Sequence, residues 1–174
     1  VGYMKQFSYI NNPHINNYQS IAAFNPKDST KAKFKIYDVE KYNGVLDIKK
    51  IKKIISNYNS IVQNLRLIKR PAENRWTQQQ EKWSEIALGE DINGNMLIIF
   101  CSYPYSMHDL NNILLELPID IMCAQHLEGG AEASLYLKYK DIELVYSGGH
   151  DNSFLSDTNF GLWRIPNIIG ISKK

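Results

Sequence analysis

Alternating apolar and polar side chains along much of the chain predict short β-strands. Such alternation is typical of strands that bury one face against a core and expose the other. Short continuous apolar runs instead indicate strands that are buried on both faces. The segments with either pattern are residues 21–24, 34–39, 61–68, 119–127, 134–139, 142–146 and 165–171. The chain is therefore expected to be rich in β-sheet.

One further pair of strands is predicted as a hairpin. The apolar segments 85–89 and 96–100 flank the dipeptide Asn93-Gly94. Asparagine and glycine tolerate the positive φ angles that a tight hairpin turn requires. We therefore expect these two strands to pair in antiparallel fashion.

Two segments carry the spacing of amphipathic helices. In residues 48–58, four isoleucines recur at helical spacing, and Asp47 is placed to cap the first turn. In the second segment, residues 106–109 have the capping-box pattern, and an apolar stripe then runs to Pro118. Many strands, two helices and short connections predict an α+β fold in one domain, with helices packed on a largely antiparallel or mixed sheet.

Composition narrows the class of protein. Of the 174 residues, 44% are hydrophobic and 22% are charged, which excludes wholesale disorder. No apolar run approaches the roughly 18–20 residues of a transmembrane helix. A net charge of +2 argues against a nucleic-acid partner, and the lysines of residues 49–53 fit the solvated face of a helix better than a nucleic-acid site. Cys101 and Cys123 lie in apolar runs, which favours buried thiols over a disulfide.

The segment 125–134 is the strongest candidate for chemistry. Gly129 and Gly130 allow a sharp turn with exposed N–H groups that can bind an anion. His126, Glu128 and Glu132 surround this turn, and crowded carboxylates can divide acid and base roles. The alternative is an ordinary β-turn with solvated glutamates.

Two arginines are candidate anion ligands. Arg66 lies among apolar neighbours, and Gln63 is assigned to the same strand face; if that face lines a cleft, Arg66 could clamp a phosphate. A solvent-facing strand arginine is the alternative. Arg164 precedes the last predicted strand and fits either a clamp or a surface ion pair. The histidines, among them His150, show no zinc-ligand spacing, so no metal site is predicted.

Four segments resemble the phosphodiester glycosidase family. Its hallmark is a buried strand ending in Asn-Leu-Asp-Gly-Gly-Gly-Ser, and the chain has His-Leu-Glu-Gly-Gly-Ala-Glu-Ala-Ser at residues 126–134. Residues 84–89 resemble the family's Ser-Arg-Thr-Ala-Ile-Gly strand, and residues 164–171 resemble its closing Arg-x-x-x-Asn-x-x-Gly-Val strand. Residues 63–68 are similar to a segment of its bacterial branch.

The chain departs from the family pattern at several positions. Glu128 replaces the hallmark aspartate, Ala131 the third glycine, and Glu132 the serine that follows. Glu85 replaces the arginine of the second motif. Family domains also carry an Asn-Gly segment ahead of the position that matches residues 2–4, so we expect residues 1–174 to be a phosphodiester glycosidase-like domain without that segment.

The resemblance implies a secreted, periplasmic or cell-envelope hydrolase that cleaves a sugar–phosphate diester and releases a sugar. Glu128 would orient the substrate or act as the general base, with Glu132 or His126 as the acid. The substrate contacts would come from Arg66, Gln63, Gly129, Gly130, Ser134, Arg164 and Asn167. No cofactor is implied, although Glu128 and Glu132 would suit a divalent cation such as Ca²⁺. The alternative is a non-enzymatic domain on the same scaffold that binds a carbohydrate or a glycan phosphate, and a structural domain with no ligand is a third reading.

Overall fold

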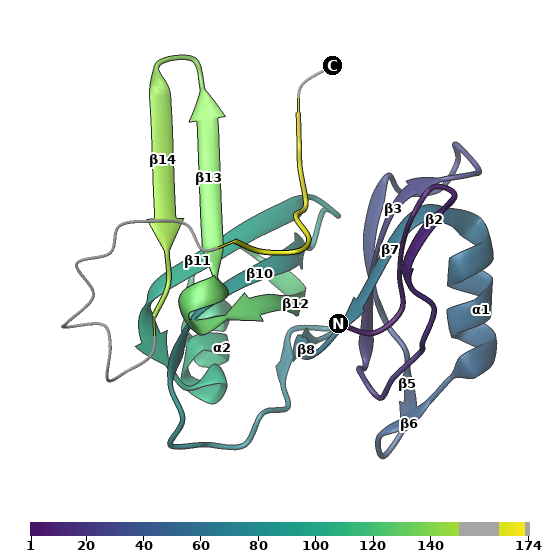
Figure 1. Cartoon of the computed structure of the whole chain (residues 1–174). Coiled ribbons are helices and arrows are strands. Elements are labelled where there is room, and N and C mark those ends of the chain that lie inside the picture. The colour runs from purple at the N-terminus through teal and green to yellow at the C-terminus, as the bar shows by residue number, and fades with distance from the viewer. Residues whose placement is uncertain (150–163, 173–174) are drawn as a thin grey trace.

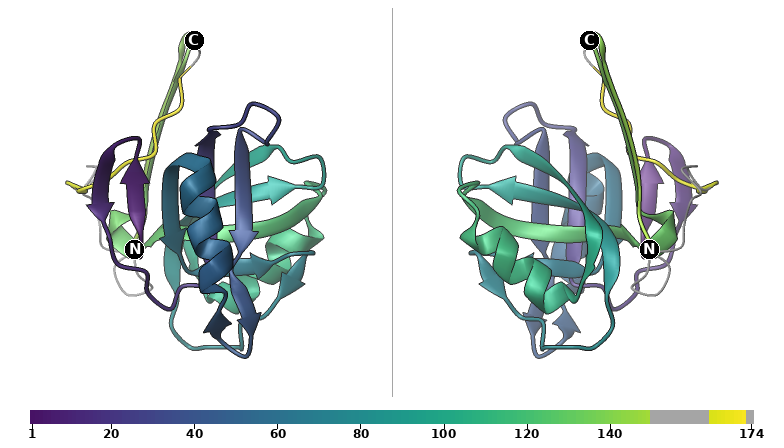
Figure 2. Two further views of the ribbon diagram at one scale, coloured as in Figure 1. Left: turned by 90° about the vertical axis from the view of Figure 1, so that its right-hand side faces the viewer. Right: turned by 90° about the vertical axis from the view of Figure 1, so that its left-hand side faces the viewer.

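The computed structural model describes residues 1–149 and 164–172. Two five-stranded sheets stack on one another, and one helix lies on the outer face of each (Figure 1). Every strand pairing in the described part of the chain is antiparallel. Figure 2 shows that the strands of one sheet run across those of the other.

The first sheet has the strand order β2-β1-β7-β3-β4. Its strands are β1 (Met4–Gln6), β2 (Tyr9–Asn12), β3 (Ser20–Pro26), β4 (Phe34–Asp38) and β7 (Tyr58–Asn64). Helix α1 (Ile48–Asn57) covers its outer face and follows the small β5–β6 ribbon, Glu40–Tyr42 and Val45–Leu46. The predicted cap is confirmed, because Asp47 accepts a hydrogen bond from the Lys50 amide at 2.9 Å. Ile51 and Ile54 of α1 pack on the sheet in one core cluster.

The second sheet has the order β11-β10-β12-β8-β9. Its strands are β8 (Arg66–Lys69), β9 (Glu73–Asn74), β10 (Trp83–Asp91), β11 (Met96–Tyr105) and β12 (Ile121–Gly129). The predicted hairpin is confirmed as β10–β11, with Gly94 at a φ of 80° in its turn. Helix α2 (Met107–Glu116) covers the outer face, and its Ser106 cap accepts from the Asp109 amide at 3.1 Å.

Strand alternation explains how both faces of each sheet are buried. In β3, Ile21 and Ala23 contact the α1 core, whereas Ala22 between them belongs to the cluster that joins the two sheets. In the second sheet, Ala87 lies in the α2 core, and Leu88 lies in the joining cluster. Continuous apolar runs in the sequence therefore reflect strands that have a core on each side.

A buried carboxylate also joins the sheets. Glu90 of β10 has a side chain that is only 1% exposed, and it pairs with Lys35 of β4 at 2.8 Å and with Arg70 at 2.6 Å. The Ile36 amide of β4 donates to its second oxygen at 2.9 Å. Burial opposes ionisation of Glu90, but the hydrogen bonds from Lys35, Ile36 and Arg70 outweigh it and hold the pKa of this carboxyl below its usual value.

Three sequence predictions need correction. Residues 61–68 form no single strand, because the chain leaves the first sheet at Asn64 and enters the second at Arg66. Residues 165–171 form no strand and are mostly exposed. The fold is more sheet-rich than predicted, because the described residues form fourteen strands and only the two expected α-helices.

The two cysteines are free thiols. Cys123 is buried in the cluster that joins the sheets, whereas Cys101 is only half-buried. Burial raises the pKa of the Cys123 thiol to about 11, so this side chain stays protonated at neutral pH. The prediction of a buried thiol is therefore confirmed for Cys123 and holds only in part for Cys101.

A second hairpin leaves the body of the molecule. After a short 3₁₀ helix, η1 (Gly130–Glu132), the strands β13 (Ser134–Tyr139) and β14 (Ile142–Ser147) pair over their whole length. Figure 2 shows this hairpin projecting far beyond the two sheets. We call it the arm.

Candidate functional site

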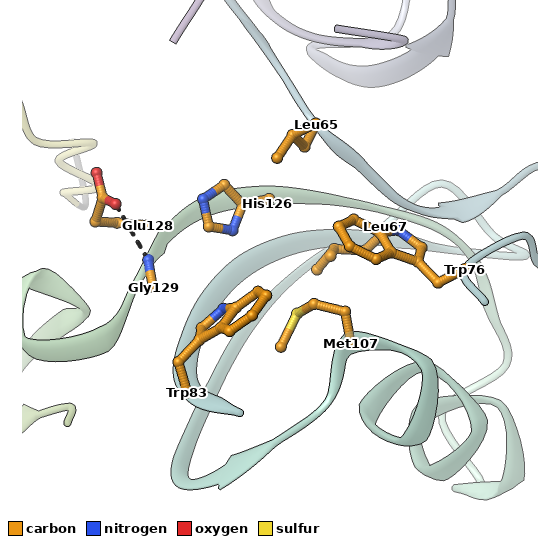
Figure 3. Close-up of a pocket in the computed structure, with 8 residues that line it drawn as sticks. All are labelled: Leu65, Leu67, Trp76, Trp83, Met107, His126, Glu128 and Gly129. Atoms are coloured by element: carbon orange, nitrogen blue, oxygen red, sulfur yellow. Dashed lines mark hydrogen bonds between the residues drawn. The ribbon is translucent and has the colours of Figure 1, made fainter. Parts of the chain in front are cut away.

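An open pocket of about 280 Å³ lies where β12 ends, beside the first turn of α2 (Figure 3). Its described lining is mostly apolar, and the two ionisable side chains in it, His126 and Glu128, come from β12. The residues that line it are Leu65, Leu67, Trp76, Trp83, Met107, His126, Glu128 and Gly129. An apolar pocket with a few convergent polar groups is the usual form of a small-molecule site.

Four parts of the chain bring these side chains together. Residues 65–67 enter the second sheet beside β12, and Trp83 begins β10 on the other side of it. Met107 opens α2, where it is fully buried. The Trp76 ring is fixed because its Nε1 donates to the Arg66 carbonyl at 2.8 Å.

A fully buried acid holds the histidine of the pocket. His126 Nδ1 lies 2.7 Å from Oε1 of Glu85, whose side chain has no exposed surface. The indole Nε1 of Trp83 donates to the other carboxyl oxygen of Glu85 at 3.1 Å. His126 Nε2 makes no hydrogen bond among the residues the structure describes, and it is the ring nitrogen left for a ligand.

The Glu85 carboxyl is strongly affected by its surroundings. Burial raises the pKa of Glu85 above its usual value, and the hydrogen bond from His126 acts against this rise. The nearby Glu128 carboxylate adds a small increase to the same pKa. A buried acid next to a histidine in a pocket is the kind of perturbed pair that occurs at functional sites.

The backbone geometry explains why two positions of the candidate motif are glycine. A Cβ at Gly129 would lie 2.5 Å from Cδ1 of Trp83, so only glycine lets β12 run this close to the indole. Gly130 has a φ of 69°, which favours glycine. The Gly129 amide donates to the Glu128 side chain at 3.2 Å, as the dashed line in Figure 3 shows.

The structure brings together only part of the predicted site. His126, Glu128 and Gly129 line the pocket. Glu132 and Ser134 follow in η1 and β13 outside its lining, and Ser134 Oγ donates to the Glu132 carbonyl at 3.1 Å.

Arg66 and Gln63 are engaged elsewhere, so the structure does not support the expected cleft role for either. Arg66 Nη1 donates to Asp38 and to Glu40, each at 2.8 Å, and the arginine side chain is only 11% exposed. Gln63 is fully buried in the first sheet, where its amide bonds the backbone of Tyr3, Asn16 and Tyr18. The two residues also lie in different sheets and share no face.

The tail residues lie apart from the pocket lining. Arg164 is exposed, and Asn167 accepts a hydrogen bond from Asn11 of β2 at 2.9 Å. His150 falls outside the described residues. Among the described lining residues there is no lysine or arginine, so His126 is the one residue of that set able to carry a positive charge. Within residues 1–149 and 164–172, no three His, Cys, Asp or Glu side chains gather as a group that could hold a metal ion.

Sequence reasoning missed most of the apolar lining and the role of Glu85. Trp76, Trp83 and Met107 come from a loop and two element ends that only the fold brings together. Glu85 had a detectable signal, because it is a charged residue inside an apolar strand segment. A charge at such a position is rarely buried without a partner, and His126 is that partner here.

Comparison with known proteins extends the sequence resemblance to nearly the whole chain. The family model described as phosphodiester glycosidase matches residues 1–172. No curated protein matches the chain. In the described part of the chain, no helix has the length and apolar character needed to span a bilayer.

Proposed function

The chain belongs to the phosphodiester glycosidase family, and from this premise we propose that it hydrolyses a sugar–phosphate diester and releases the sugar. A fold or family alone does not fix an activity, so the proposal rests on the site. The observation that carries it is the Glu85–His126 pair at the edge of the pocket, where a buried carboxyl contacts one ring nitrogen and leaves the other for substrate.

His126 is the proposed acid. With Glu85 ionised, the Nδ1 proton points at this carboxylate, and Nε2 gains and gives up the second proton. Glu85 holds the ring in place, and a protonated His126 is the one cation that the described part of the lining can offer. An imidazolium here donates its proton to the departing phosphate oxygen and offsets the negative charge of the phosphate. Glu85 has no exposed surface, so it acts as a positioning residue.

Glu128 is the proposed base. It lines the same pocket as His126 and comes two residues later on β12. Its carboxylate takes a proton from water as the water oxygen bonds to the anomeric carbon of the sugar. The bond between that carbon and the phosphate oxygen breaks, which yields the free sugar and a phosphomonoester. The proton from His126 balances the one that Glu128 receives.

The apolar lining is the proposed sugar platform. Trp76 and Trp83 offer large flat faces, and Met107 closes the pocket from the side of α2. The C–H face of a sugar ring packs well on such surfaces, while its hydroxyl groups reach the polar residues of β12. We place the phosphate at the His126 end, because the other lining residues that the structure describes carry no cation.

Isotope labelling tests which bond breaks. The intact protein would be incubated in H₂¹⁸O with glycosyl phosphodiesters, including N-acetylglucosamine-1-phospho-sugars. Glycosidic cleavage places the label in the released sugar, whereas attack on phosphorus places it in the phosphate. Label in the phosphate, or no release from any compound of the panel, would contradict the proposal.

A specific observation favours a second candidate, a non-enzymatic domain that binds carbohydrate. The part of the pocket lining that the structure describes is mostly apolar and holds no arginine or lysine. Such a site suits an uncharged sugar better than a phosphodiester. Saturable binding of the same sugars without any turnover, followed by calorimetry, would support this candidate. A location in the periplasm, at the cell envelope or outside the cell is part of the proposal and follows from the family alone.

A further inference from the structure

The arm carries a continuous apolar stripe on one face. Residues directly opposite each other in an antiparallel pair point to the same face, and successive residues alternate. On one face the three cross-strand pairs are all apolar: Leu135–Tyr146, Leu137–Leu144 and Tyr139–Ile142. The other face is partly polar, because Lys138 pairs with Glu143 at 3.5 Å and Tyr136 Oη donates to Glu143 at 3.1 Å. The arm therefore has the pattern of a sheet with one buried face.

This apolar face is nevertheless open to solvent. Tyr139 is 59% exposed and Ile142 is 54% exposed, and Leu137 and Leu144 are exposed as well. Figure 2 shows that the arm stands clear of both sheets. A two-stranded hairpin is at best marginally stable in water unless another layer covers it. A contiguous exposed apolar surface of this kind marks an interaction site.

The apolar surface continues onto the body of the molecule. Tyr146 at the base of the arm stacks on Phe100 of β11, with ring centroids 5.5 Å apart. Ile98 is two residues away on the same edge strand and is 46% exposed. We call these two residues and the six apolar residues of the arm the stripe. Six of these eight side chains are 37–59% exposed, whereas Leu135 and Phe100 are partly buried. At on the order of 100 Å² for each exposed side chain, the stripe supplies roughly 600 Å² per copy.

The stripe is suited to a second copy of itself. Two copies would bury about 1,200 Å² in total, which is the lower end of the range for specific interfaces. The charged residues near the tip are Lys138, Lys140, Asp141 and Glu143, which sum to zero, so two arms do not repel each other. In a two-fold dimer the same surface of each copy contacts the other, so that surface must be complementary to itself. The stripe is flat and apolar throughout and is therefore self-complementary.

We propose that two copies of this chain form a two-fold dimer in which the apolar faces of their arms pack against each other. The arms run antiparallel, with the axis near the central pair Leu137–Leu144. Each tip then lies toward Phe100 and Ile98 of the other copy. The polar face of each arm stays in water.

Two glutamate substitutions on neighbouring residues provide a matched test. Leu144→Glu places a charge in the stripe, and Val145→Glu places the same charge on the opposite face, where Val145 is 52% exposed. Sedimentation equilibrium would follow the mass of each protein over a hundredfold range of concentration. We expect a dimer for the parent and for Val145→Glu. We expect the dimer dissociation constant of Leu144→Glu to rise about a hundredfold or more. The two introduced glutamates, one from each copy, would be buried without partners near the two-fold axis.

Cross-linking tests the register in the folded parent background. Diamide would oxidise Leu137→Cys to a disulfide-linked dimer by taking up the two thiol hydrogens. Lys138→Cys, on the other face, and the parent with its two native cysteines are the controls. Circular dichroism would confirm that each variant is folded. A parent that stays monomeric at every concentration, equal weakening by both glutamates, or equal cross-linking at residues 137 and 138 would each overturn the proposal.

Discussion

At the scale of single residues, the pocket depends on one close approach and one buried pair. The approach is between the Gly129 backbone and the Trp83 ring, and the pair is Glu85 with His126. Trp83 takes part in both, because its indole donates to Glu85 and lies against Gly129. A change at any of these positions is therefore expected to alter the shape and the chemistry of the pocket together.

Gly129→Ala tests the close approach. The new Cβ would lie 2.5 Å from Cδ1 of Trp83, so the indole must move and its bond to Glu85 is weakened. We expect a loss of stability of about 1–3 kcal/mol, together with a shifted tryptophan emission. Gly170→Ala is the control, because nothing lies within 4 Å of a Cβ at that exposed site. Unchanged emission and stability for Gly129→Ala would contradict this account.

Glu85→Gln tests the buried pair through activity. The amide keeps the size of the side chain but has neither the titratable proton nor the negative charge of the carboxyl beside His126 Nδ1. We expect kcat for sugar release to fall about 10²-fold, with a smaller effect on KM and an altered acid limb of the pH–rate profile. A purely structural role for Glu85 would leave the shape of the pH–rate profile unchanged.

The same variant has a distinct pH dependence of stability. Burial raises the pKa of Glu85, so the folded protein keeps this proton over a pH interval, beginning near 4.5, in which the unfolded chain has lost it. The free energy of unfolding therefore falls as the pH rises through that interval. We expect the Gln variant to lack this fall in urea titrations at several pH values. Parallel pH profiles for the two proteins would contradict the prediction.

At the scale of elements, the joint between β4 and β10 is ionic. Glu90 is buried, and Lys35, Arg70 and the Ile36 amide all bind it. We expect Glu90→Gln to lower the free energy of unfolding at neutral pH by about 3 kcal/mol, since two cations lose their partner. The pKa of Glu90 is lowered, so this stability is present above the usual pKa and is lost as the pH falls through the lowered value. Chemical denaturation from neutral to acid pH would show the parent and the variant converging.

Local sequence signals predicted most of the elements. The isoleucine spacing of α1, the capping pattern of α2 and the Asn93-Gly94 turn each depend on neighbouring residues, and all three are confirmed. The prediction of one strand over residues 61–68 was wrong, because the apolar pattern continues where the chain passes from one sheet to the other at Leu65. No local pattern records such a crossover.

The candidate site was only partly predictable for the same reason. His126, Glu128 and Gly129 lie close together in sequence, so their gathering at one pocket could be expected. Arg66 could not be assigned, because its partners Asp38 and Glu40 come from another part of the chain and only the fold places them beside it. The aromatic lining is likewise a property of the fold.

At the scale of the whole molecule, the two sheets share one core. Leu88, Cys123, Ala22 and Ile36 form the cluster between them, and Leu88 is 1% exposed. We expect Leu88→Ala to lower the free energy of unfolding by about 3 kcal/mol. Both sheets should still unfold in one transition, with its midpoint shifted equally for each. Tryptophan emission, to which Trp76 and Trp83 contribute, reports on the second sheet, and far-ultraviolet circular dichroism reports on both sheets. Two separate transitions in the parent would contradict a shared core.

The most direct test of the proposed active site is the pH dependence of sugar release by the His126→Asn variant. The substrate would be a glycosyl phosphodiester that the parent cleaves, and His14→Asn, an exposed histidine outside the pocket lining, is the matched control. We predict that kcat/KM of His126→Asn falls about 10²–10⁴-fold and that the limb of the pH–rate profile due to the histidine disappears, while His14→Asn matches the parent. Activity of His126→Asn equal to that of the parent, with an unchanged pH–rate profile, would show that this pocket is not where the reaction takes place.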